Sequence, residues 1–343
     1  MQQPFGSTAQ LRAAFNAGLL QLAQQEGLGP FILTCANATF DPALFPGLEA
    51  PLRERFARLA EDYVQAFQAG RPVAAVEEDL LVFLKIFAAG FDALQLTELR
   101  QQDHWYVQFN HLRSFRPRRI TQNVPDGIAA PFNPDGFHFN RPFMQQECFW
   151  WGELAGRRLD LYYNKYPFAP LHGLLVPERM ACYPQLLTAE MHDYIWGLAQ
   201  ALQSTLPGVG FGYNGFGAYA SVNHLHFQMY VDPNPMPVQA ERWMHNGGRE
   251  PYPAACVVFD AVEAAWACLT ELREQAQPYN ALYLPGQCYI FPRRKQGSVP
   301  VPVWSSGFSW YELAGGMLAF NRDDYASLTA TAIETELARL RPE

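Results

Sequence analysis

The sequence predicts an α+β fold in which a helical N-terminal region precedes an antiparallel sheet with flanking helices. Apolar residues recur at helical intervals through the first hundred residues. From about Trp105 to Val231 the chain changes to short aromatic and β-branched runs separated by Pro and Gly, a pattern typical of antiparallel strands. With 343 residues, 49% of them hydrophobic, the chain can bury a substantial core.

The N-terminal helices show clear start and stop signals. Ser7 and Gln10 have capping-box spacing before an apolar stripe, and a second stripe runs through residues 52–67. Acidic residues at 77–79 precede an apolar run that stops at Gly90. We expect these segments to form a helical cap or layer.

The remaining elements follow in order along the chain. A helix is predicted from about Thr188 to Leu206, closed by a Pro-Gly pair, and a final helix after Asp323 and Asp324. Residues 232–255 are rich in Pro and polar residues, which predicts a long loop near the site. Strands are expected at Trp105–Phe109, Leu159–Tyr163 and Leu174–Val176.

Composition excludes several classes of partner. A net charge of −8 provides no basic field for nucleic acid, although a few local cations could hold a small anion. The chain does not start with a cationic segment before an apolar run, and no window reaches the ~20 apolar residues of a membrane helix, so we expect a cytoplasmic protein. The six cysteines include no C-x-x-C pair, which favours reduced thiols and predicts no structural zinc.

The segment 221–231, SVNHLHFQMYV, alternates polar and apolar residues. Period-two alternation predicts a strand with His224, His226 and Gln228 on one face, lining a cavity. The two histidines could be hydrogen-bonded core residues, metal ligands or catalytic groups. A zinc site would need a third ligand, for which the sequence offers no ligand-spaced cluster; the candidates are a carboxylate or His104, His111, His138, His172, His192 and His245.

A Gly-rich segment, 212–221, favours the catalytic interpretation. Backbone N–H groups near Gly217 could approach an anion, and Asn214 and Ser221 add side-chain donors a few residues before the imidazoles. An ordinary glycine hairpin would explain the segment without the histidines, but here it leads directly into H-L-H-F-Q.

Two motifs resemble the histidine-triad and galactose-1-phosphate uridylyltransferase superfamily, in its H-x-H-x-Q form. Residues 214–228 read NGFGAYASVNHLHFQ, and residues 164–177 read NKYPFAPLHGLLVP. Within the superfamily the chain is most similar to the GDP-hexose phosphorylases, which share the A-S-V-N-H-L-H run and resemble YVQFN at 106–110, FHFN at 137–140, PRR at 292–294 and YELAG at 311–315. The likeness spans roughly Trp105 to Leu328, and residues 1–100 show none.

The resemblance implies a histidine-triad-like sheet and a covalent mechanism. It makes His226 the nucleophile that takes up the nucleotide on its α-phosphorus, with His224 helping to orient the site. Gln228 replaces the third histidine of the hydrolytic branch. An amide can hydrogen-bond a phosphoryl oxygen but cannot shuttle a proton, so transfer suits this site better than hydrolysis.

The resemblance also implies binding residues. Ser221 matches a phosphate-contacting serine and Asn164 a ribose-contacting residue, whereas His172 either contacts the ligand or braces the sheet. Among the basic residues of HLRSFRPRR and FPRRKQ, which include Arg116, Arg118, Arg119, Arg293 and Lys295, we choose Arg113 and Arg294 to hold phosphate groups. Glu312 could accept hydrogen bonds from a sugar or base, or only terminate a strand.

The expected function is phosphorolysis of a nucleoside diphosphate sugar, best matched by a GDP-hexose, without cofactor or metal. Small molecules would be its partners, and a homodimer is retained as one option. Alternatives are a diadenosine polyphosphate phosphorylase, a sugar-1-phosphate nucleotidyltransferase, and a nucleotide-binding regulatory protein without turnover. The expected regions are 1–100, helical; 101–235, nucleotide-binding and catalytic; and 236–343, completing the substrate side.

Overall fold

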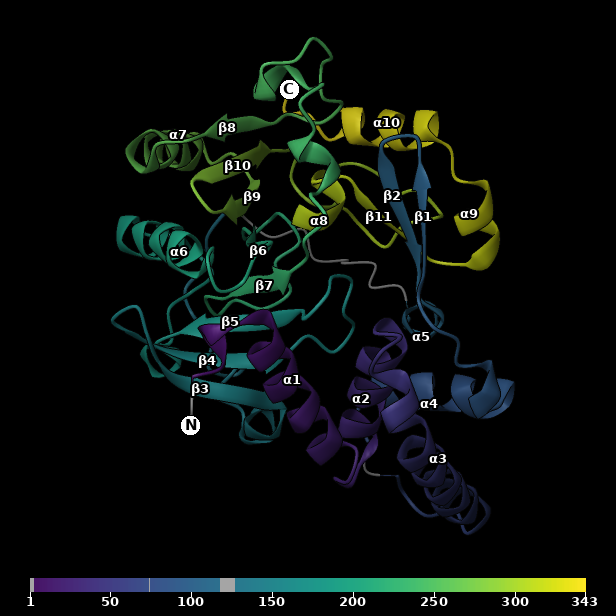
Figure 1. The fold of residues 1–343 in the computed structure, drawn as a ribbon. Coiled ribbons are helices and arrows are strands. Elements are labelled where there is room, and N and C mark those ends of the chain that lie inside the picture. Colours follow the sequence, from purple (N-terminus) through teal and green to yellow (C-terminus); the bar gives the residue numbers. More distant parts are fainter. Residues whose placement is uncertain (1–2, 74, 118–126) are drawn as a thin grey trace.

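The computed structural model describes residues 3–73, 75–117 and 127–343 and has the α+β fold predicted from the sequence. Within these residues the strands form an eight-stranded sheet and a separate three-stranded sheet (Figure 1). The helical N-terminal region and the helices flanking the sheet are confirmed.

The large sheet is antiparallel at every described pairing and positions the site. Its strand order is β3-β4-β5-β7-β6-β9-β10-β8. The central strands β6 and β9 are buried along their whole length, which explains why their sequences lack simple alternation. The strand bounds are β3 Cys148–Leu154, β4 Arg157–Tyr163, β5 Gly173–Pro177, β6 Val209–Asn214, β7 Phe227–Val231, β8 Val257–Phe259, β9 Tyr279–Leu284 and β10 Gln287–Pro292.

Helices on both faces account for this burial. The helices α6 (Ala189–Leu202) and α7 (Val262–Glu274) pack along one side of the sheet, and the short helix α8 (Trp310–Leu313) packs against β6 and β9 on the other (Figure 1). Thr188 caps α6 by accepting a hydrogen bond from the Met191 N–H. The predicted helix therefore begins where expected and ends at Leu202, before the Pro-Gly pair.

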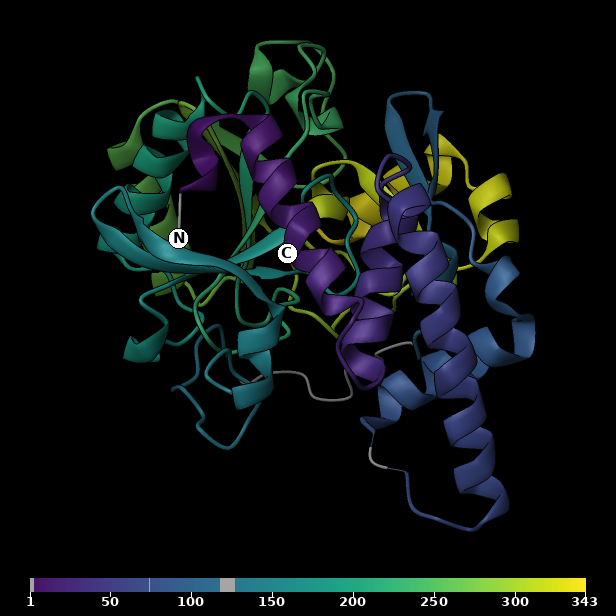
Figure 2. The ribbon, with the colours of Figure 1, turned by 60° about the horizontal axis from the view of Figure 1, so that its bottom comes forward.

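The described residues of the N-terminal region form four α-helices, which share the main core with the sheet. Figures 1 and 2 show α2, α3 and α4 grouped on one side of the molecule, while α1 lies against β3. Ser7 caps α1 as predicted, and the Tyr163 hydroxyl of β4 donates to the Phe15 carbonyl of α1. The helices are α1 Thr8–Leu22, α2 Leu28–Phe40, α3 Phe45–Gln68 and α4 Glu77–Ala89.

The small sheet forms the centre of a second apolar cluster. Strand β2 lies between β1, antiparallel to it, and β11, parallel to it. These strands are β1 Glu98–Gln102, β2 Trp105–Phe109 and β11 Gly316–Ala319. The other helical segments are η1 Pro4–Gly6, η2 Phe91–Ala93, α5 His111–Ser114, η3 Pro142–Glu147, η4 Arg179–Ala181, η5 Pro237–Gln239, η6 Met244–Asn246, α9 Arg322–Ser327 and α10 Ala330–Arg339.

Three expectations need correction, and a fourth stays a proposal. The strand predicted over 221–231 begins only at Phe227, so His224 and His226 precede it. The final helix is two helices, because Leu328 leaves the helical conformation and Thr329 caps α10. The large sheet continues to β10, beyond residue 235, so the division of the chain at 100 and 235 stays a proposal. Residues 232–255 are largely irregular as predicted, but they pack in the second apolar cluster and line neither cavity of the site.

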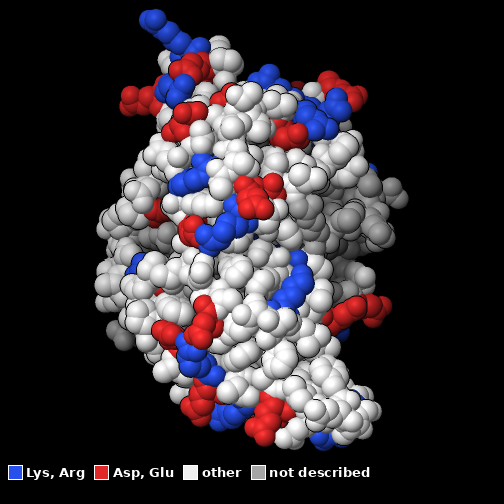
Figure 3. Space-filling view, turned by 90° about the vertical axis from the view of Figure 1, so that its right-hand side faces the viewer, with Lys and Arg blue, Asp and Glu red and all other residues white. Residues whose placement is uncertain are grey.

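Charge is distributed without a dominant sign on the face drawn in Figure 3, where acidic and basic side chains are interspersed. None of the helices in residues 3–73, 75–117 and 127–343 has the length and apolar character needed to span a membrane.

Candidate active site

Two adjoining cavities meet beside the end of β7. The larger has a volume of about 690 Å³ and the smaller about 200 Å³. His226 lines the larger cavity. The residues that line both are Arg116, Asn164, Tyr166, Ser221 and Gln228. Because the shared wall includes three of the predicted site residues, we treat the two cavities as halves of one site.

The imidazole of His226 is held in one tautomer. Its Nδ1 lies 2.8 Å from the carbonyl oxygen of His224, which can only accept, so Nδ1 carries the proton. The lone pair of the neutral ring is therefore on Nε2. The ring is 4% exposed and lies with its centroid 5.3 Å from that of Phe139.

Gln185, which the sequence gave no reason to select, fixes the backbone at His226. The His226 N–H donates to Gln185 Oε1 at 2.9 Å, and Gln185 Nε2 donates to the carbonyl of Asn214 at 2.9 Å. This buried amide thereby joins the end of β6 to the segment before β7. Gln185 lies in the irregular segment before α6 and belongs to no sequence motif, so the sequence alone could not identify it as part of the site.

Burial lowers the pKa of His226 to about 4, with the hydrogen bond to the His224 carbonyl opposing the shift. Burial also lowers the pKa of His224 to about 4. Both rings are therefore neutral near pH 7. The ordinary pKa of about 6.5, which the sequence alone would suggest, does not apply in the fold.

We expect the His226 ring of the folded protein to titrate with a midpoint near 4, because its charged form loses hydration. Selective ¹⁵N labelling of histidine and NMR titration would measure it. In concentrated urea the same histidine should titrate with the ordinary pKa of a solvated imidazole, about 6.5. Midpoints that coincide in the folded and unfolded protein would contradict this burial argument.

His224 contributes its carbonyl to the site, and its side chain lies elsewhere. The ring is buried between Phe132 and Phe139, accepts a hydrogen bond from the Phe139 N–H at 3.3 Å, and lines neither cavity. The expectation that its imidazole shares a cavity-lining strand face with His226 is therefore corrected. His224 precedes strand β7, so the alternation of side chains along a strand does not determine which way its ring points.

The amide of Gln228 is oriented by two groups. Trp310 Nε1 donates to Gln228 Oε1 at 2.8 Å, and the ring of His172 also hydrogen-bonds this side chain. His172 Nδ1 in turn accepts from the Phe168 N–H at 3.3 Å, which fixes the position of this ring. With the oxygen occupied, the Gln228 Nε2 donors are available to a ligand in either cavity.

His172 is a brace in this structure. It has 0% exposure and lines neither cavity, and burial lowers its pKa to about 3. Of its two roles expected from the sequence, direct ligand contact is not what the geometry provides. Its Nε2 also lies 3.2 Å from Asn164 Nδ2.

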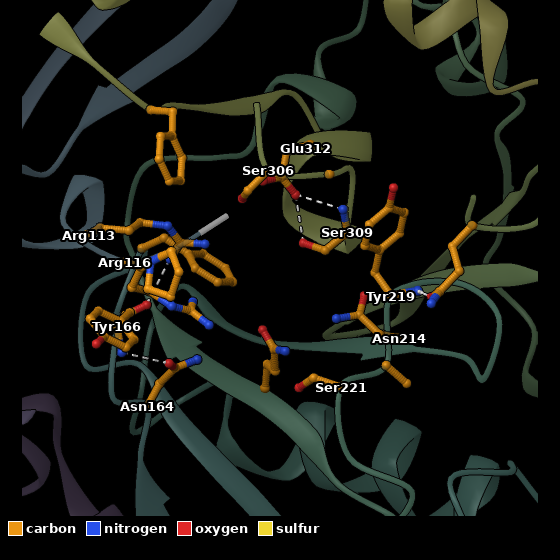
Figure 4. A pocket seen from close by; sticks show the side chains of 17 residues that line it. Arg113, Arg116, Asn164, Tyr166, Asn214, Tyr219, Ser221, Ser306, Ser309 and Glu312 are labelled. Atoms are coloured by element: carbon orange, nitrogen blue, oxygen red, sulfur yellow. Dashed lines mark hydrogen bonds between the residues drawn. The ribbon is translucent and has the colours of Figure 1, made fainter. Parts of the chain in front are cut away.

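Asn164 lines both cavities beside Ser221, as the motifs suggested. Its Oδ1 accepts from the Tyr166 N–H at 3.1 Å (Figure 4). Its carbonyl accepts from Asn37 of α2 at 3.1 Å, so an N-terminal helix supports this segment.

The smaller cavity is basic on one side. Figure 4 shows Arg113 and Arg116 facing Asn214 and Tyr219 across it. Arg113 Nη1 donates to the Tyr166 carbonyl at 2.9 Å, and its guanidinium lies 5.3 Å from the ring centre of Phe168. Burial lowers the pKa of Arg113 to about 10, Arg116 adding to the shift and Glu312 opposing it, so it remains cationic.

Glu312 belongs to helix α8 and terminates no strand. Its Oε2 accepts from the Ser309 N–H at 2.7 Å and from the Ser309 hydroxyl at 2.6 Å, closing a capping box. It also lines the smaller cavity, and burial raises its pKa. A capping role and a ligand-binding role are compatible here, since a carboxylate has further acceptor sites.

Asn214 is oriented as a donor. Its Oδ1 accepts from Asn280 Nδ2 at 2.7 Å and from the Trp310 N–H at 2.9 Å. Figure 4 shows the amide nitrogen turned into the cavity. The predicted donor role of Asn214 is geometrically available.

Two of the predicted anion-binding residues lie away from the cavities. Arg294 pairs with Glu343 at 2.9 Å and lines neither cavity, and its neighbour Arg293 is the buried one, 4.8 Å above the Tyr219 ring. Gly217 is required by the turn, with φ of +82°, but it lines neither cavity. The other expected cations, Arg118 and Arg119, lie outside the described residues.

The larger cavity is lined by aromatic and charged side chains, a combination that the sequence did not indicate. Helices α2 and α4 close one side of it, so the N-terminal region helps to form the site. The apolar lining includes Phe137, Phe139, Phe143 and Met144, and the charged lining includes Glu78, Asp79, Arg116, Glu147 and Lys165.

Among the described residues, no group of three His, Cys, Asp or Glu side chains is arranged to hold a metal ion.

This combination of an antiparallel sheet, a buried neutral imidazole and paired cavities defines a site suited to nucleotidyl transfer. Residues 85–230 match the family described as GDPGP1-like, N-terminal domain. The chain is 31% identical over 146 residues to GDP-D-glucose phosphorylase 1 of Danio rerio, covering 42% of this chain and 41% of that protein. It is 27% identical over 151 residues to GDP-L-galactose phosphorylase 2 of Arabidopsis thaliana, covering 39% of this chain and 34% of that protein.

These matches confirm the resemblance to the GDP-hexose phosphorylases, although the chain spans only about two fifths of the length of the first relative. The family match starts at residue 85, so the absence of likeness expected for 1–100 does not hold for its last part. A solved structure, yeast Ap4A phosphorylase Apa2 in complex with Ap4A, aligns with a TM-score of 0.49 and 17% identity, covering 78% of this chain and 99% of that chain.

Proposed function

We propose that this protein cleaves a GDP-hexose with orthophosphate through a covalent guanylyl-His226 intermediate, giving GDP and hexose 1-phosphate. The observation that carries the proposal is the position of His226, whose neutral ring lines an aromatic cavity of about 690 Å³ that shares a wall with a smaller basic one. Ligand sites of roughly 300–1,000 Å³ accommodate molecules of nucleotide size. The names of the relatives support the choice of nucleotide sugar.

In the first half-reaction the Nε2 lone pair of His226 forms a P–N bond with the α-phosphorus. The bond from that phosphorus to the bridging oxygen breaks, and hexose 1-phosphate leaves with the electron pair. The His224 carbonyl, which accepts the Nδ1–H at 2.8 Å, stabilises the positive charge that develops on the ring. A sugar phosphate is a weak base, so its departure needs little general acid.

Polar groups of the shared wall would stabilise the phosphoryl oxygens. The Gln228 amide, whose oxygen is held by Trp310, presents N–H donors, and Ser221 adds a hydroxyl. Arg113 in the smaller cavity would bind the leaving phosphate and then the incoming one. In the second half-reaction an orthophosphate oxygen attacks phosphorus, the P–N bond breaks, GDP forms and the neutral imidazole is restored.

Trapping the intermediate tests this proposal. When the enzyme is mixed with GDP-hexose labelled on the α-phosphate and orthophosphate is withheld, we expect base-stable, acid-labile label on protein and a burst of hexose 1-phosphate no larger than the enzyme concentration. Added phosphate should chase the label into GDP. UDP-hexose and diadenosine tetraphosphate serve as comparison substrates. Product formed in a single turnover without protein-bound label would refute the covalent route.

A further inference from the structure

An unpaired carboxylate lies in the larger cavity at the end of η3. Glu147 is half-buried and lines this cavity, and it has no hydrogen-bond or salt-bridge partner among the described residues. Lys165, which follows β4, lines the same cavity and pairs with Asp79 of α4. Burial raises the pKa of Glu147 to about 7, with the charge of Lys165 opposing the shift and that of Asp79 adding to it.

The aromatic lining makes this cavity the place for a purine. Phe137 and Phe143 lie with ring centroids 6.1 Å apart and remain about half exposed at 48% and 52%, so their faces are available for stacking. The smaller cavity, with two arginines, suits the phosphates and sugar instead. His226 lines this same cavity together with Phe137 and Phe143.

Glu147 in its ionised form and Lys165, which line the same cavity, offer a hydrogen-bonding pattern that is complementary to guanine. Guanine presents N1–H and N2 amino donors beside the O6 acceptor on one edge. A carboxylate can accept from both donors at once, and an ammonium group can donate to O6. Adenine presents an acceptor at N1 and a donor at N6. The carboxylate would then face another acceptor, and the ammonium group would face another donor.

We infer that Glu147 accepts the N1–H and N2 amino hydrogens of guanine while Lys165, held by Asp79, donates to O6. This assignment rests on the proposed function, because it names the base of the nucleotide carried by His226. Asp79 is a positioning residue in this arrangement, since it orients Lys165. The N-terminal helices therefore contribute to base selection.

Direct binding of free nucleotides tests the inference without turnover. By calorimetry, we expect the wild type to bind GDP about 10–100-fold more tightly than IDP, which lacks the N2 amino group, as expected for one hydrogen bond to a charged acceptor. In Glu147→Gln the ratio of GDP to IDP affinity should fall toward one. Lys165→Met should weaken GDP and IDP about equally and leave their ratio unchanged, because both carry O6.

Glu153→Gln is the matched control, since Glu153 is an exposed residue of β3 outside both cavities. It should leave the ratio at the wild-type value. Equal binding of GDP and IDP by the wild type, or an unchanged ratio in a folded Glu147→Gln protein, would overturn the inference. If an adduct forms on His226 and does not depend on Glu147, the proposed function stands and the assignment of Glu147 fails. If the protein discriminates GDP from IDP through Glu147 but forms no adduct, guanine recognition stands and the proposed covalent function fails.

Discussion

Replacing His226 by alanine is expected to abolish the covalent adduct and to lower kcat by roughly four orders of magnitude or more, the scale seen when a nucleophile is removed. No other imidazole can replace it, because the rings of His224 and His172 are buried outside both cavities. Nucleotide binding should persist, because the aromatic and charged walls of the larger cavity remain. Rapid-quench measurement of label on protein and steady-state assays would provide both quantities.

His245→Ala is a suitable control for this variant. His245 is a partly buried histidine that hydrogen-bonds the Val238 carbonyl and lines neither cavity. It should retain the adduct and nearly full kcat. Label that persists in His226→Ala, or that maps after proteolysis to a different residue, would show that the imidazole only binds substrate.

Replacing Arg113 by alanine is expected to lower kcat/KM for orthophosphate by about one to two orders of magnitude. This corresponds to losing a charge-assisted hydrogen bond of about 1.5–3 kcal/mol. Arg113→Lys should recover only part of the loss, because an ammonium group cannot form the two parallel bonds of a guanidinium. Phosphate dependence of the chase from labelled enzyme to GDP would measure the effect separately from the first half-reaction.

Arg294→Ala provides the contrast, since Arg294 was an equally good choice from the sequence. Its ion pair with Glu343 is largely exposed, with side-chain exposures of 38% and 83%, and it lines neither cavity. We expect its removal to leave phosphate kinetics near the wild-type values. An equal loss in both variants would indicate a general effect of net charge and would contradict a phosphate site at Arg113.

Local features of the sequence determined most of the secondary structure. The Ser7 cap, the acidic start of α4 and the stop at Gly90 act within one or two helical turns, so they can be recognised without tertiary information. Strand β2 matches its predicted bounds for the same reason, because aromatic and β-branched residues indicate a strand locally. The two sequence motifs also brought His226, Gln228, Ser221 and Asn164 together correctly around the cavities.

The direction of individual side chains around the site was decided by tertiary contacts. Alternation suggested that His224 faces the cavity, but the chain there is not hydrogen-bonded into the sheet, and packing against Phe132 and Phe139 turns the ring away. Tertiary contacts also decided which of two adjacent arginines is buried: other segments cover Arg293, whereas Arg294 stays partly exposed.

The sequence by itself therefore determined the class of fold and the order of its elements, and it singled out His226 as the imidazole proposed to react. Only the tertiary structure decided that Gln185 holds the His226 backbone, that Trp310 orients Gln228, and that helices α2 and α4 close the larger cavity. The physical reason is range. Caps, turns and periodicity depend on neighbours within a few residues. A cavity depends instead on burial and on hydrogen bonds between segments that are up to about two hundred residues apart. Isolated Gln, Trp or Glu residues carry no local signal of those contacts.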